Sequence, residues 1–137
     1  MAIYGVGAYY GGDKRDVSDQ FIAKNLIGTG WEFEDAPELR EYFRSLKVGD
    51  IVYIKVAAFG REKIGVKGIG IIRDEVILGS KDTDSLVTTG RNVIWLSKEH
   101  FDIPRPTEKN NVRSNTVYEE FHPAVLKEII SKIKLSV

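Results

Sequence analysis

The segment from Ile51 to Phe121 constrains the fold most, because no part of it has helical periodicity. Four runs within it have the length and composition of strands, with polar loops at Gly79 to Gly90 and Asp102 to Ser114. A parallel sheet needs a crossover between successive strands, usually a helix, so these strands must pair mainly antiparallel. We therefore predict one α/β (α+β) domain over residues 1–137, built on a curved, mostly antiparallel β-barrel with flanking helices. The four runs are IVYIKV (51–56), GVKGIGIIRDE (65–75), RNVIWL (91–96) and SNTVYEEF (114–121).

The two ends of the chain add one strand and three helices to this prediction. Ile3 to Tyr10 is predicted to form the first strand. Ser18 is predicted to cap a short helix that ends near Asn25, and Asp35 to cap a second helix. His122 and the proline after it are typical of the start of a terminal helix. The residues predicted to face inward from these helices are Phe21, Ile22, Leu39, Tyr42, Phe43, Leu46, Val125, Leu126, Ile129, Ile130 and Ile133.

The charge and composition of the chain limit the classes of function that it can have. The chain carries 20 basic and 20 acidic residues, so its formal net charge is zero. Non-specific binding of a polyanion rests on counterion release by many cations, so a nucleic acid or nucleotide needs a local patch or pocket here. Cysteine is absent, which removes disulfides, thiolate zinc sites and cysteine nucleophiles. The sequence shows no signal peptide and no membrane span, so we expect a cytoplasmic protein that does not contact a membrane.

Signals for catalysis are weak. His100 and His122 are the only histidines, and neither belongs to a cluster with the spacing of metal ligands. The glycines of GVGAYYG (5–11) do not have dinucleotide-binding spacing. The acidic run from Glu32 to Glu41 fits the start of a solvated helix better than a pair of catalytic carboxylates. We therefore expect a binding module rather than an enzyme, with no cofactor and no metal.

Several aromatic residues lie beside glycines or at element ends, where their rings can project into a cleft. Aromatic faces hold a flat ligand, and a few fixed donors and acceptors read its edge. The alternative is that the rings only plug the barrel ends and that Lys55 reaches to solvent. Neighbouring strand residues face opposite ways, so we expect Tyr9 to share the pocket with Trp31 and Tyr10 to pack near Phe21. The candidate pocket consists of Tyr9, Tyr10, Trp31, Lys55, Phe59, Lys63 and Arg113.

A family resemblance rests on five pieces, in the order GAYYGGD…SDQFI, GW, LKVGDIVYIK, GVKGIGII and RSNTVYE. Together they resemble PUA-like (EVE/YTH-related) domains, above all those fused to the NTPases of McrBC-type modification-dependent restriction systems. RSNTVYE fits less tightly, since such domains place the threonine nearer the arginine. The resemblance implies a pocket between the first strand's end, the lysine-ending strand and the last strand, which holds a modified base flipped out of DNA or RNA. It adds Gly11, Gly12, Asp13, Ser18, Asn115 and Thr116 to the candidate ligand-binding residues.

Three functions remain open on the sequence alone. The first is a reader of a modified base in DNA or RNA, in restriction-modification or phage defence. Such a reader has no effector attached here, so we expect an effector protein as its partner. The second is a stand-alone, phage-encoded sponge that sequesters a cyclic or linear nucleotide second messenger. The third is a protein–protein adaptor, and the sequence carries no signal for an oligomeric state.

Overall fold

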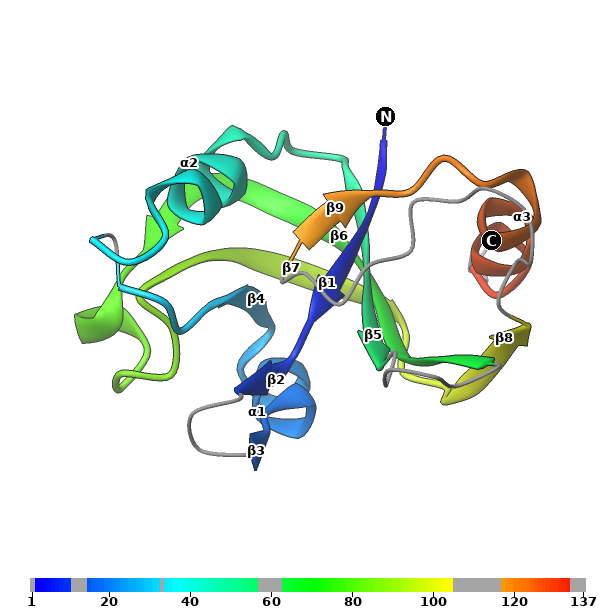
Figure 1. Cartoon of the computed structure of the whole chain (residues 1–137), viewed down its shortest axis with the longest axis horizontal. Helices are drawn as coiled ribbons and strands as arrows, with labels where there is room; N and C mark the ends of the chain where they lie inside the picture. The colour runs from blue at the N-terminus through cyan, green and yellow to red at the C-terminus, as the bar shows by residue number, and fades with distance from the viewer. Residues whose placement is uncertain (1, 11–14, 33, 57–62, 105–116, 134–137) are drawn as a thin grey trace.

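The computed structural model describes residues 2–10, 15–32, 34–56, 63–104 and 117–133 (Figure 1). These ranges form an α+β domain in which three helices pack on a mixed sheet of seven strands, with a separate two-stranded hairpin. The elements are β1 (Ile3–Gly7), β2 (Tyr9–Tyr10), β3 (Arg15–Asp16), α1 (Ser18–Lys24), β4 (Leu26–Thr29), α2 (Pro37–Ser45), β5 (Ile51–Val56), β6 (Lys63–Leu78), the 3-10 helix η1 (Ser80–Asp82), β7 (Thr89–Ser97), β8 (Phe101–Pro104), β9 (Val117–Glu119) and α3 (Pro123–Ser131).

The strands of the main sheet follow the order β4-β7-β6-β5-β1-β9, and β8 pairs with β6 beyond this path. All pairs in it are antiparallel except β1 with β5, which run parallel. The prediction of a mostly antiparallel sheet is therefore confirmed. Among the described residues the edge strands β4 and β9 do not pair with each other, so the sheet stays open where a closed barrel was expected.

Both faces of β5 are buried, and they belong to two different cores. Val52 and Ile54 lie in a core shared with α1 and α2, whereas Ile51 and Tyr53 lie in a core shared with α3. Figure 1 shows α3 on the right, apart from α1 and α2. Because strand side chains alternate between faces, the sequence pattern predicted this division correctly. We call the first the α1 core and the second the α3 core.

The helices form where expected, but the two predicted caps, Ser18 and Asp35, are wrong. Ser18 is the first residue of α1, and its N–H donates to Asp16 Oδ1 at 2.8 Å. Ala36 occupies the cap position of α2, and no side chain caps that helix, so Asp35 does not have the predicted role. His122 does cap α3, because its Nδ1 accepts a hydrogen bond from Ala124 N–H at 3.1 Å. Asp35 lies one residue before the cap position of α2.

Several other expectations differ from the structure. The first strand breaks at Ala8, so Tyr9 and Tyr10 belong to the hairpin β2–β3 and not to the main sheet. β4 and β8 were not expected, since both are short and contain glycine or proline, which weaken strand signals. Ile130 was expected to be buried but is exposed. The face of α3 that packs on the sheet is narrower than the distribution of apolar residues along this helix suggests.

Candidate functional site

The candidate site lies at one edge of the sheet, where four strands meet. β1 and β5 are parallel, so both end at this edge, and the register pairs Gly7 with Lys55. β6 and β9 run the opposite way and begin there, as the pairs Val56–Gly65 and Val6–Val117 show. The resemblance implies a pocket bordered by the first strand's end, the lysine-ending strand and the last strand. The corresponding ends of β1, β5 and β9 therefore lie together. The predicted residues Gly11, Gly12, Asp13, Phe59, Arg113, Asn115 and Thr116 lie outside the described residues.

The hairpin β2–β3 presents two tyrosines in different surroundings. The side chain of Tyr9 is 62% exposed. Tyr10 is partly buried, and its ring stands edge-on to Phe21 with 6.5 Å between the ring centroids. Its hydroxyl donates to Leu86 O at 2.6 Å, and its ring covers Gly30, which leaves no room for a side chain there. Tyr10 thus packs near Phe21 as expected, and Tyr9 is free to meet a ligand.

Trp31 follows the end of β4, next to the position that Tyr10 covers. Its side chain is 57% exposed. Its backbone is held by Thr29 and Thr88: the Trp31 N–H donates to Thr29 Oγ1 at 3.1 Å, and Thr88 Oγ1 donates to Trp31 O. The contact through Gly30 places Tyr10, rather than Tyr9, beside this segment. The pairing of Tyr9 with Trp31 in one pocket remains a prediction.

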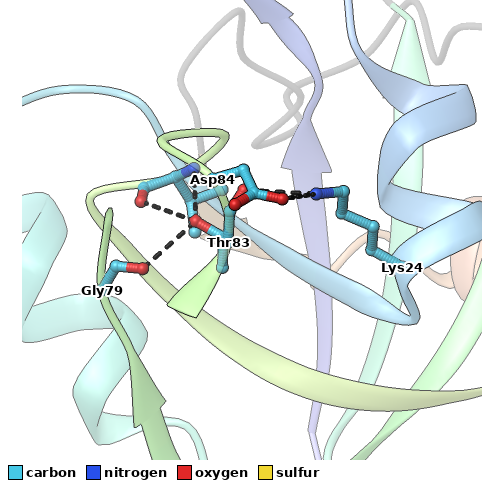
Figure 2. Close-up of polar contacts among 5 residues, drawn as sticks. Lys24, Gly79, Thr83 and Asp84 are labelled. Carbon is cyan, nitrogen blue, oxygen red and sulfur yellow. Dashed lines mark hydrogen bonds and ion pairs between the residues drawn. The ribbon is translucent and has the colours of Figure 1, made fainter. Parts of the chain in front are cut away.

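The loop between η1 and β7 contacts both aromatic residues, because Leu86 O accepts from Tyr10 and Thr88 donates to Trp31 O. Figure 2 shows the polar contacts that hold this loop. Thr83 is buried, and its hydroxyl bonds to Gly79 O at 3.1 Å and to both the N–H and the C=O of Val87 at 3.2 Å. Lys24 of α1 reaches across to the loop, with Nζ 3.3 Å from Thr83 O and 3.5 Å from the Asp84 carboxylate. The loop that carries Leu86 and Thr88 is therefore tied to α1, the helix against which Tyr10 packs.

Lys55 does not reach to solvent. It is only 4% exposed, and its Nζ lies 5.0 Å from the centre of the Tyr118 ring. The alternative in which a lysine at this strand end extends to water is therefore wrong, because the neighbouring strands cover its stem on the face of the α3 core. Its role as a ligand donor stays a prediction.

A buried hydrogen-bond chain continues from Tyr118 into the α3 core. The Tyr53 hydroxyl donates to Glu120 Oε2 at 3.0 Å and lies 3.1 Å from the Tyr118 hydroxyl. An ionised carboxylate only accepts, so the Tyr53 proton points to Glu120 and Tyr118 is the donor to Tyr53. Desolvation by burial, with the nearby Tyr118 and Glu120, raises the pKa of Tyr53. Gly5 leaves the space that both rings occupy, since a Cβ there would lie 2.8–2.9 Å from them.

Two further predicted residues lie apart from these groups. Lys63 is exposed at the start of β6, opposite Pro104 of β8. Ser18 is buried at the start of α1. The structure thus brings the predicted strand ends together, but the predicted site residues lie on both sides of the sheet.

A cavity of about 370 Å³ opens at the same edge. Lys55 is not among its lining residues, although its cross-strand partner Val66 is. Sequence reasoning missed this cavity. The sequence did contain a signal for the segment that lines it. In HFD (100–102) a polar residue lies on each side of an aromatic residue, which is the alternation typical of a half-buried strand. The cavity is lined by Val56, Gly65, Val66, Lys67, His100, Phe101 and Asp102.

Asp16 connects the tyrosine hairpin to this cavity. Its Oδ2 accepts from Lys67 Nζ at 2.6 Å, and Asp16 pairs with Tyr9 across the hairpin. Desolvation on partial burial raises the pKa of Asp16, but the hydrogen bonds from Lys67 and Ser18 outweigh it, so the pKa lies below its ordinary value. The cross-strand partner of Tyr9 is therefore ion-paired with Lys67, a residue that lines the cavity.

The Asp16–Lys67 pair should make stability depend on acid pH. Because the folded pKa of Asp16 is lowered, the contribution is complete above its unfolded pKa of about 3.9 and is lost as pH falls through the folded pKa. Asp16→Asn should therefore lower the free energy of unfolding near pH 7 by about 0.2–1 kcal/mol, a range suited to a partly exposed pair. The difference from the wild type should shrink below about pH 4. Urea unfolding at pH 3 to 7 measures it.

Asparagine keeps an oxygen for the Ser18 N–H, so the substitution isolates the ion pair. The control is Lys67→Met. In that background, Asp16→Asn should have no further effect at pH 7, and an unchanged effect would show that Lys67 is not the partner that matters.

Comparison with known proteins adds no identification. No family model matches the chain, and no curated protein does either. No helix within the described ranges is long and apolar enough to cross a membrane. The same ranges contain no group of three or more histidine, cysteine, aspartate or glutamate residues that could hold a metal ion.

Proposed function

We propose that this domain is a non-enzymatic module that binds a nucleobase, presented as a modified base by DNA or RNA, and that its sheet is of the PUA-like type. The observation that carries the proposal is a cavity at the end of β5 and the start of β6, one of whose lining residues, Lys67, is ion-paired with the hairpin that carries the exposed Tyr9. Tyr9 is linked to that cavity through its cross-strand partner Asp16 and through Lys67. The resemblance to base-flipping domains implies a pocket bordered by β1, β5 and β9, and the cavity shares β5 with that pocket but is otherwise lined from β6 and the start of β8.

The cavity suits a flat ligand in size and chemistry. Ligand sites range from about 300 to 1,000 Å³, and this one, at about 370 Å³, is at the small end of that range. Val56 and Phe101 provide apolar surface, Gly65 allows close approach to the backbone, and His100 and Asp102 provide polar groups. An apolar surface with a few polar groups at its rim is how proteins hold a base that has left its stack.

A free nucleotide is the other ligand with this chemistry, and salt dependence separates it from a nucleic acid. Binding of a long nucleic acid should weaken steeply with salt, because several phosphates release counterions. A mononucleotide or small cyclic nucleotide should show a much shallower slope. Mass spectrometry of small molecules released from the denatured protein would identify a co-purified nucleotide and favour the sponge.

Removal of the exposed tyrosine ring tests the proposal. Tyr9→Ala should weaken binding of single-stranded oligonucleotides that carry a modified cytosine or adenine by about 1–3 kcal/mol, the contribution of stacking one base on an aromatic ring. Fluorescence anisotropy at fixed ionic strength measures the affinity. The matched control is Phe121→Ala, which removes another exposed ring, one that precedes α3 and does not line the cavity.

The control should keep wild-type affinity, and both variants should unfold cooperatively. Equal affinities for the wild type and Tyr9→Ala would contradict a stacking role for Tyr9. No binding by the wild type to any oligonucleotide or nucleotide would overturn the proposed function and leave the adaptor as the function to test.

A further inference from the structure

The polar side chains that line the cavity differ in whether they already form an ion pair or a hydrogen bond within the protein. Lys67 is ion-paired with Asp16. Within the described part of the chain, the Asp102 carboxylate and the His100 imidazole have no hydrogen bond or ion pair, although both line the cavity. Both residues are exposed, so their polar groups are accessible to a ligand that enters the cavity.

The backbone of β8 explains why these two side chains lie together. Phe101 lies against the α3 core, and Lys132 Nζ is 5.1 Å from its ring centre. His100 precedes Phe101 and Asp102 follows it, so the two polar residues flank this aromatic residue, which also lines the cavity. Asp102 pairs with Gly65 across the strands, and its Oδ1 lies 3.6 Å from where a Gly65 Cβ would stand. Gly65 therefore leaves the Asp102 carboxylate uncovered.

The chemistry of this pair selects among bases. An ionised carboxylate accepts hydrogen bonds and cannot donate, so Asp102 suits an N–H group and repels a carbonyl oxygen. Imidazole has an N–H that can donate to a ring nitrogen or a carbonyl. Cytosine, adenine and guanine carry an exocyclic amine beside such an acceptor, and acidic side chains accept from cytosine N4 in DNA recognition. Uracil and thymine present only one N–H, between two carbonyls.

We propose that this cavity takes an amino-bearing nucleobase, with Asp102 accepting from the exocyclic amine and His100 donating to the neighbouring ring acceptor. This assignment rests on the proposed nucleobase function and names the edge of the base that the protein reads. The exposed ring of Tyr9, tied to the cavity rim through Asp16 and Lys67, is then the stacking partner.

Titration of the whole isotope-labelled chain with CMP, AMP, GMP and UMP, followed by amide chemical shifts, tests the assignment. At least one amino-bearing nucleotide should bind about 10- to 100-fold more tightly than UMP, the difference expected from a hydrogen bond to a charged group. The largest shifts should fall at Gly65, Lys67 and Asp102. Ribose 5-phosphate, which has no base, should bind no better than UMP.

Asp102→Asn provides the decisive variant, because a carboxamide offers both an acceptor and a donor. It should bind UMP and the amino-bearing nucleotides within about 3-fold of each other, while Glu75→Gln, an exposed site on β6, keeps the wild-type preference. Equal wild-type affinities for all four nucleotides would overturn the assignment and leave base binding standing. Chemical-shift changes confined to Tyr10 and Trp31 in the wild-type protein would also overturn the assignment. No binding of any nucleotide or oligonucleotide would overturn both proposals.

Discussion

Replacement of Arg91 by methionine should lower the free energy of unfolding by about 3–5 kcal/mol, the cost of leaving several buried polar groups without a partner. Arg91 is 1% exposed. Its Nη1 donates to three carbonyls at the end of α2, those of Phe43 (3.1 Å), Arg44 (3.4 Å) and Leu46, and its Nη2 donates to Asp74 O at 2.7 Å. One guanidinium thus closes the end of α2 and ties it to β6. Methionine fills part of the volume but donates nothing to these carbonyls.

Urea unfolding at neutral pH measures the change. Arg91→Lys should recover part of the loss, since an ammonium can reach one or two carbonyls but lacks the planar fork of the guanidinium. Arg73→Met is the matched control, because Arg73 is exposed on the same sheet and, within the described ranges, forms an ion pair with the neighbouring Asp74 at 3.4 Å. Its effect should stay within about 0.5 kcal/mol. An Arg91→Met protein as stable as the Arg73→Met protein would show that the guanidinium does not hold α2.

The second large effect is expected for Tyr10→Ala, which should cost about 3–4 kcal/mol of stability. The substitution removes the ring between Phe21 and Gly30 and the hydrogen bond of its hydroxyl to Leu86 O. Tyr10→Phe isolates the hydroxyl and should cost about 1 kcal/mol. Thermal and urea unfolding of the variants measure both contributions.

The adjacent tyrosine is the natural control for Tyr10. Tyr9→Ala should change stability by less than about 0.5 kcal/mol, because its ring is mostly in solvent. The same Tyr9→Ala protein should lose affinity for the base-bearing ligand. Of the two neighbouring tyrosines, Tyr10 should thus contribute to stability and Tyr9 to binding. A larger loss of stability for Tyr9→Ala than for Tyr10→Ala would exchange their roles.

The predictable part of the candidate site follows from strand geometry. Alternation separated Tyr9 from Tyr10 and placed Tyr10 near Phe21, as the ring contact shows. The position of Lys55 near the end of β5 was also correct, but whether its side chain is buried was left open, since burial depends on which strands lie on either side. The cavity was missed because β8 is short, contains a proline and is brought to β6 only by tertiary pairing.

Local periodicities could be read from the order of the residues: the two faces of β5, the buried stripe of α2 and the start of α3. These patterns follow from the geometry of a single segment, which every strand or helix of that sequence must obey. Only the tertiary structure decided that Asp16 meets Lys67, that Arg91 closes α2 and that His100 and Asp102 open on one cavity. Such contacts join residues far apart in the chain, and they depend on strand order and register, which no single segment contains.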